Sequence, residues 1–70
     1  MELSKDTRLK DLLDAYPTLK NQLPEINPKF AMINSPMGKI MIHRVTLSDM
    51  SEKSGMDFDV LIEGIRALIQ

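Results

Sequence analysis

Residues 45–55 read VTLSDMSEKSG and contain both a start signal and a stop signal for one short helix. The Thr46 hydroxyl suits the N-cap position, and Asp49 can return a hydrogen bond from three residues further on, as in a short-armed capping box. Gly55 suits the left-handed residue that follows many helices. The stretch therefore predicts a helix whose inward side chains are Leu47, Met50 and Ser54.

A second helix is predicted after this turn, with Asp57 as its cap. Its apolar residues recur at roughly 3.6 spacing and form one expected stripe: Val60, Leu61, Ile65 and Leu68, with Phe58 and Ile62 nearby. Two helices around Gly55 have the outline of a helix-turn-helix. However, the second helix carries Asp57, Asp59 and Glu63 with Arg66 as its only cation, so DNA phosphates would repel it. We predict a helical hairpin that packs inside the fold.

The preceding stretch, residues 27–45, is rich in methionine and has no acidic residue. Asn27 and Pro28 open a turn in which Phe30 and Ile33 are the expected buried contacts. Ser35 then reads as an N-cap followed by Pro36 at the first helical position. Gly38 weakens the helix by roughly 1 kcal/mol relative to alanine. We interpret its apolar residues as one buried, adaptable stripe: Met37, Ile40, Met41 and Val45.

The N-terminal part predicts two more short helices. Asp6 or Thr7 can cap the first, whose apolar stripe is Leu9, Leu12, Leu13 and Tyr16, and Pro17 stops it near Ala15. Leu19 and Leu23 indicate a second helix that Pro24 should close. No stretch alternates cleanly enough to predict a strand. The sequence thus predicts an all-α fold, a compact array of four to five short helices in a single small domain over residues 1–70.

The composition excludes several classes of protein. The chain has no cysteine, so disulfide scaffolds, thiol catalysis, iron–sulfur clusters and cysteine zinc sites are ruled out. The N-terminus is charged and no apolar run approaches the ~18 residues of a membrane span, so we expect a cytoplasmic protein with no membrane partner. The chain ends in mid-helix at Gln70, which fits either a fraying end or the N-terminal module of a longer protein.

Charge is unevenly distributed along the chain. Residues 1–28 hold five acids and four bases (−1), residues 29–45 hold three bases (+3), and residues 46–70 hold five acids and two bases (−3), which sum to the net charge of −1. We interpret the basic middle as paired with its acidic flanks on the folded surface. No global positive field recruits nucleic acid, so we expect no nucleic-acid partner.

The candidate chemical groups are few. His43 is the only histidine, and nothing local supplies the orienting carboxylate that a catalytic base requires. Met41 and His43, with Met32 and Met37, offer soft ligands of the kind that Cu(I) prefers. On one helix, however, residues two apart point about 200° apart. We predict no enzyme, no catalytic or metal-binding residue, no cofactor and no small-molecule substrate.

The chain resembles the family called domain of unknown function 1858, a small bacterial and archaeal domain. The resemblance covers nearly the whole chain and rests on these residues: Leu9, Leu12, Leu13, Tyr16, Pro17, Leu19, Asn27, Pro28, Phe30, Pro36, Met37, Val45, Thr46, Leu47, Met50, Gly55, Met56, Leu61 and Ile62. It implies a compact helical domain that occurs alone or at the N-terminus of larger proteins, some with hemerythrin-like or PAS sensory modules. One branch carries Cys-x-x-Cys in the middle region and is associated with hybrid-cluster redox proteins. Residues 30–36, FAMINSP, have no cysteine, so that redox role does not carry over.

Two hypotheses of function remain open. The first is a non-catalytic interaction module that docks onto a partner protein, a fused domain or a second copy of itself, because Met-rich surfaces repack easily. Its expected contact region is Met37, Lys39, Met41, His43 and Arg44. The second is a ligand- or metal-sensing element of a redox or signalling protein, with His43 and nearby methionines as ligands.

Overall fold

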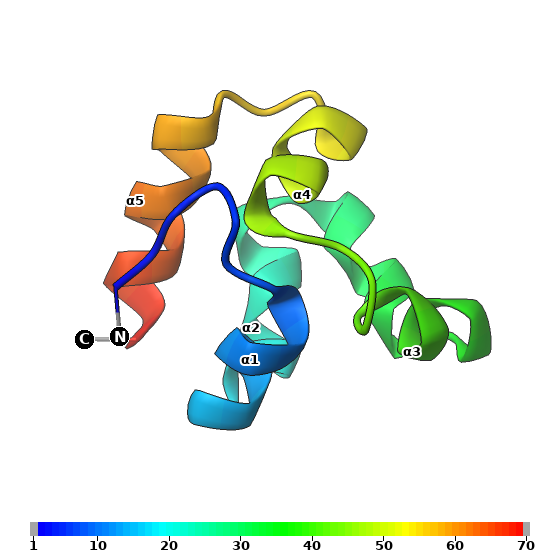
Figure 1. Cartoon of the computed structure of the whole chain (residues 1–70). Coiled ribbons are helices and arrows are strands. Elements are labelled where there is room, and N and C mark those ends of the chain that lie inside the picture. The colour runs from blue at the N-terminus through cyan, green and yellow to red at the C-terminus, as the bar shows by residue number, and fades with distance from the viewer. Residues whose placement is uncertain (1, 70) are drawn as a thin grey trace.

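The structure, a computed structural model, describes residues 2–69 and confirms the all-α prediction (Figure 1). Six short helices follow one another along the chain: α1 (Leu9–Ala15), α2 (Leu19–Ile26), the 3-10 helix η1 (Pro28–Asn34), α3 (Pro36–Met41), α4 (Leu47–Ser54) and α5 (Phe58–Ile69). The described residues contain no strand, although Arg8 and Thr46 form one isolated antiparallel bridge. The sequence predicted a turn where η1 lies, and η1 is the helix beyond the four to five expected.

One core joins all the helices. α2 packs against both η1 and α5, while α3 packs on η1 and α4 packs on α5. Phe30 and Ile33 of η1 are buried, as predicted. The largest side chains with almost no exposure come from α1, α2, α4 and α5: Leu9, Leu12, Leu19, Leu23, Leu47, Leu61 and Ile65. Each helix is short, so its stability depends on burying this apolar surface rather than on its own helix propensity.

The start of α1 differs from the prediction. Arg8 occupies the N-cap position and its side chain makes no capping bond. Thr7 instead accepts a hydrogen bond from the Ser4 N–H through its hydroxyl. The first amides of α1 donate to distant carbonyls: Leu9 N–H to Val45 at 3.0 Å and Lys10 N–H to Ile42 at 3.1 Å. Capping by Asp6 or Thr7 was therefore wrong, because the backbone after α3 satisfies these donors.

The predicted end of α2 at Pro24 was also wrong. The helix contains Pro24 and continues to Ile26. Proline removes one backbone donor from the helix, yet Leu19 and Leu23 are completely buried and hold α2 against its neighbours. The chain leaves helical geometry at Asn27, whose side chain accepts the Lys29 N–H at 2.9 Å and so caps η1.

The predicted start and end of α4 are confirmed. Thr46 Oγ1 accepts the Asp49 N–H at 3.2 Å, and Asp49 Oδ2 accepts the Thr46 N–H at 3.0 Å, so both bonds of the capping box are present. Gly55 ends the helix with a φ of 76°, in the left-handed region. Ser54 is buried, as expected.

The stripe predicted for α5 is wrong at one position. Val60 is 55% exposed, whereas Leu61, Ile62 and Ile65 are buried. α5 packs against both α2 and α4, so its buried face is centred between these two neighbours and Val60 falls outside it. The N-terminal segment covers another part of α5, where the Lys5 ammonium lies 5.7 Å from the centre of the Phe58 ring.

Candidate functional site

The junction between η1 and α3 is built on a close backbone contact at Gly38. A Cβ at this position would lie 1.9 Å from the Met32 carbonyl oxygen and 2.6 Å from the Ile33 Cα. Ser35 connects the same two helices, because its hydroxyl accepts the Gly38 N–H at 3.0 Å and donates to the Met32 carbonyl at 2.6 Å. Gly38 is therefore the residue of α3 that faces inward, and only glycine leaves room for the contact.

This contact turns two residues of the predicted apolar stripe outward. Met37 is 67% exposed and Ile40 is 60% exposed, so their expected burial was wrong. The inward residues follow Gly38 at helical spacing: Met41 and Ile42, which are partly buried, and Val45, which is buried as predicted. Met32 on η1 is 52% exposed. We call Met32, Met37 and Ile40 the η1–α3 surface.

The basic residues near this surface are not paired with the acidic flanks. Lys39, His43 and Arg44 are all exposed. Among residues 2–69, the only ion pair joins Lys10 to Asp14 within α1. The interpretation of the basic stretch as internally paired was therefore wrong, since no carboxylate within residues 2–69 lies at ion-pair distance from its cations.

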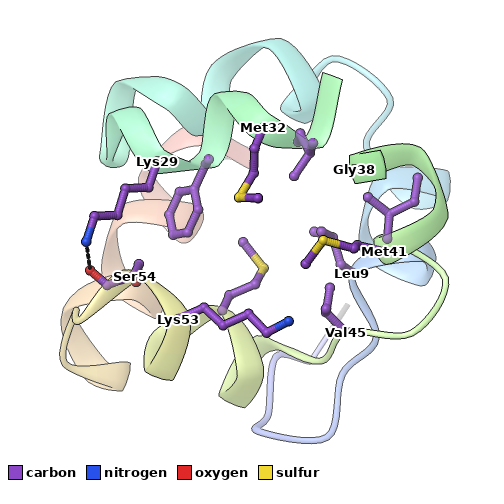
Figure 2. Close-up of a pocket in the computed structure, with 12 residues that line it drawn as sticks. Leu9, Lys29, Met32, Gly38, Met41, Val45, Lys53 and Ser54 are labelled. Atoms are coloured by element: carbon purple, nitrogen blue, oxygen red, sulfur yellow. Dashed lines mark hydrogen bonds between the residues drawn. The ribbon is translucent and has the colours of Figure 1, made fainter. Parts of the chain in front are cut away.

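A small apolar cavity lies behind the same surface, between η1, α3, α4 and the start of α1 (Figure 2). Its volume is about 60 Å³. The side chains of Met32 and Met41 point into it, while Lys29 and Lys53 extend along its edge from η1 and α4 (Figure 2). We call this cavity the η1–α4 pocket. Its full lining is Leu9, Lys29, Phe30, Met32, Ile33, Gly38, Met41, Ile42, Val45, Met50, Lys53 and Ser54.

The five predicted contact residues lie in two different environments. Four of them, Met37, Lys39, His43 and Arg44, are exposed, whereas Met41 lines the η1–α4 pocket. His43 does not line that pocket.

Sequence reasoning missed Met32 and Ile40 as surface residues, and Lys29 and Lys53 as pocket residues. The signal that could have found the first pair is Gly38, because a glycine inside a short helix often marks a close contact between helices. No comparable signal joins the two lysines, since they lie on helices distant in the sequence.

Within residues 2–69, no group of three or more His, Asp or Glu side chains lies close enough to hold a metal ion. None of the helices described is long and apolar enough to cross a membrane. What the site offers chemically is apolar contact area with ammonium groups beside it.

Comparisons with known proteins agree with the resemblance seen in the sequence. A search of curated proteins and a search of solved structures found no matching protein. A family model matches residues 3–62, which include the helix caps, the Gly38 contact and the start of α5. The chain therefore belongs to the family described as a domain of unknown function (DUF1858).

Proposed function

We propose that this domain is a non-catalytic interaction module that binds a partner protein through the η1–α3 surface. The observation that carries the proposal is the position of its exposed apolar side chains. Four large apolar side chains among residues 2–69 are more than half exposed, and three of them form this surface. Exposed apolar side chains on two helices that pack together are typical of a binding surface, and methionines adapt readily to a partner.

Charge indicates the chemistry of the partner. The surface lies in the stretch that carries +3 and no acid, with Lys39 beside Met37 and Ile40 on α3. Complementary charge across an interface speeds association and selects the partner. The partner we propose is therefore a segment of another protein with acidic residues next to apolar ones, such as an amphipathic helix with an acidic edge.

The test is a selection of binding peptides from a displayed random library, followed by amide chemical-shift mapping. We expect the selected peptides to combine Asp or Glu with large apolar residues and to shift amides of η1 and α3. The Met37→Asp, Ile40→Asp double variant should weaken binding more than tenfold. Val60→Asp is the matched control, because Val60 is similarly exposed but lies on α5.

Three results would contradict the proposal. These are selected peptides that map to α5, peptides that bind the double variant as well as the natural chain, or a selection that yields no binder. Light scattering of the unmixed domain addresses self-association. A dimer that the double variant dissociates would mean that the surface binds a second copy of the chain instead.

A further inference from the structure

We propose that the η1–α4 pocket receives one aliphatic side chain of the partner protein, and that acidic residues on either side of this anchoring side chain pair with Lys29 and Lys53. This inference rests on the proposed function, since the anchor belongs to the same partner segment. It adds where that segment is anchored and where its acids lie. Four properties of the pocket support it: its opening, its lining, its volume and the charges at its edge.

The pocket has a buried floor and an exposed opening. Among the residues that line it, Lys29, Met32 and Lys53 are exposed, whereas Phe30 and Met50 are buried. A cavity with both kinds of lining residue is open to solvent at the exposed ones, so the opening lies between η1 and α4. Met32 lies at this opening and is also part of the η1–α3 surface. A partner that covers the surface therefore reaches the opening.

The lining favours an apolar group. Ile33 and Met50 are among the buried apolar residues that form the walls. The Ser54 hydroxyl is already used, because it donates to the Ser51 carbonyl at 3.3 Å and accepts the Met56 N–H at 3.3 Å. The walls therefore present no free side-chain hydroxyl to hold a polar group or an ordered water.

The volume suits a single side chain. A cavity needs roughly 15 Å³ to hold one water-sized group, so the pocket volume of about 60 Å³ has room for about four such groups. That room matches the side chain of a valine, leucine, isoleucine or methionine. The side chains of Met32 and Met41 point into the pocket (Figure 2), and their flexibility lets the walls adjust to the anchor.

The two lysines place positive charge on different sides of the opening. Lys29 Nζ lies 3.5 Å from the Ser54 carbonyl oxygen, whereas the ammonium of Lys53 points toward Val45 (Figure 2). Neither lysine forms an ion pair with a carboxylate of residues 2–69. A segment that crosses the opening therefore meets one ammonium group on each side of its anchor, and a separate acidic residue can pair with each.

The test is an NMR titration of the domain with the capped pentapeptide acetyl-Glu-Ser-Leu-Ser-Glu-amide. In an extended peptide, side chains two apart point to the same side, so both acids accompany the leucine. We expect amide shifts at Ile33, Val45 and Met50, with a dissociation constant on the order of 5 mM. The same peptide with alanine in place of leucine should bind about tenfold more weakly. The leucine peptide with lysines in place of both acids should also bind about tenfold more weakly.

Filling the pocket tests the position of the anchor. Val45 is buried and lines the pocket, so Val45→Ile adds a methylene group where the anchor would lie. Affinity for the leucine peptide should fall about fivefold. The melting temperature should not fall, because the added group fills a cavity. Val60→Ile is the matched control, because Val60 is exposed on α5 and does not line the pocket.

Lysine variants test the charges. Lys29→Gln and Lys53→Gln should each weaken binding of the leucine peptide about threefold, and the double variant should weaken it about tenfold. Lys39→Gln is the control, because Lys39 is exposed on α3 and does not line the pocket. Thermal melts of all variants show that they fold.

Four results would overturn the proposal: no binding of the leucine peptide, equal affinity for the leucine and alanine peptides, full binding by Val45→Ile, or full binding by the double lysine variant. Shifts confined to Leu3, Ile62 and Arg66 would overturn it too, since those residues line a different hollow beside α5.

A last comparison separates this proposal from the proposed function. Peptides selected from the random library should lose affinity both for Val45→Ile and for the Met37→Ala, Ile40→Ala double variant. The leucine pentapeptide should bind that double variant normally, because neither residue lines the pocket. Library peptides that lose affinity only for the double variant would overturn the anchor and leave the proposed function standing. Library peptides that lose affinity only for Val45→Ile would overturn the η1–α3 surface and leave the pocket as the binding site.

Discussion

The junction between η1 and α3 and the turn between α4 and α5 each depend on a glycine, but for different physical reasons. Gly55 has a φ of 76°, and a Cβ there would meet no atom within 4 Å. Gly38 does not have a positive φ, yet a Cβ there would overlap the backbone of η1. One glycine is required by its own backbone conformation, and the other by a neighbouring helix. Local and tertiary requirements therefore coexist in one short chain.

The largest effect should come from Gly38→Ala. Because the obstructing atoms are backbone atoms of Met32 and Ile33, η1 and α3 must move apart. We expect a loss of about 3 kcal/mol in the free energy of unfolding, a large share of the stability of so small a domain. Urea denaturation followed by circular dichroism measures it.

Gly64→Ala is the matched control for that substitution. Its Cβ would meet only side-chain atoms of Ile26, the nearest at 3.3 Å, and alanine has the better helix propensity in α5. Its effect should stay within about 1 kcal/mol. Equal losses at the two positions would show that the contact between η1 and α3 is not the cause.

A smaller effect is expected from Ser35→Ala, compared with Thr46→Ala. Both residues cap helices, but Ser35 also donates to the Met32 carbonyl and so connects η1 to α3. We expect losses of about 1.5 kcal/mol for Ser35→Ala and about 1 kcal/mol for Thr46→Ala in urea denaturation. A larger loss at Thr46 would argue that the bond to Met32 adds nothing to the η1–α3 junction.

Gly55→Ala should cost about 1 kcal/mol, because alanine is strained at a positive φ. Gly55→Asn should cost less, since asparagine tolerates the left-handed region. At Gly38 the order should reverse, because asparagine is larger than alanine and the obstacle there is space. Thermal melts of the four variants measure both orders. If asparagine were tolerated better than alanine at Gly38, then space would not be what requires glycine at that position.

The smallest effect on stability should come from the exposed ion pair between Lys10 and Asp14. This pair lies on α1, outside the two glycine regions compared above. The pKa of Lys10 is raised by its hydrogen bond to Asp14, with Nζ 2.7 Å from Oδ2, and by the attraction of that carboxylate. Because the folded pKa exceeds the unfolded value, the pair stabilises the fold below the unfolded pKa and this contribution is lost as pH rises through the folded pKa. Asp14→Asn should lower the Lys10 pKa measured by NMR and remove this alkaline loss. An unchanged Lys10 pKa would mean that the pair does not persist in solution.

The difference between local and tertiary requirements explains which structural features could be predicted from the sequence. The Thr46 and Asp49 capping box and the turn at Gly55 lie within one short stretch, so their pattern predicted α4 correctly. The inward face of α3 depends on where η1 lies, and for that reason Met37 and Ile40 were predicted to be buried although they are exposed.

The pocket was beyond prediction for a related reason. Lys29 and Lys53 both line it only because η1 and α4 lie on either side of it, with α3 and the start of α1 completing the walls. No local pattern of spacing contains that information. The predicted contact residues on and just after α3 remain a prediction, and Met41 is the one of them that lines the pocket.

The start of α1 has a consequence for the order of folding. Its first two amides donate to the carbonyls of Val45 and Ile42, and the Leu47 amide donates back to the Thr7 carbonyl at 2.9 Å. These bonds form only after the chain has closed a long loop, so the N-terminal end of α1 is satisfied only once that loop has closed. Slow hydrogen exchange at Leu9 and Lys10 should therefore report opening of the whole domain, whereas the amide of Asp49, capped within its own turn, can be protected without it.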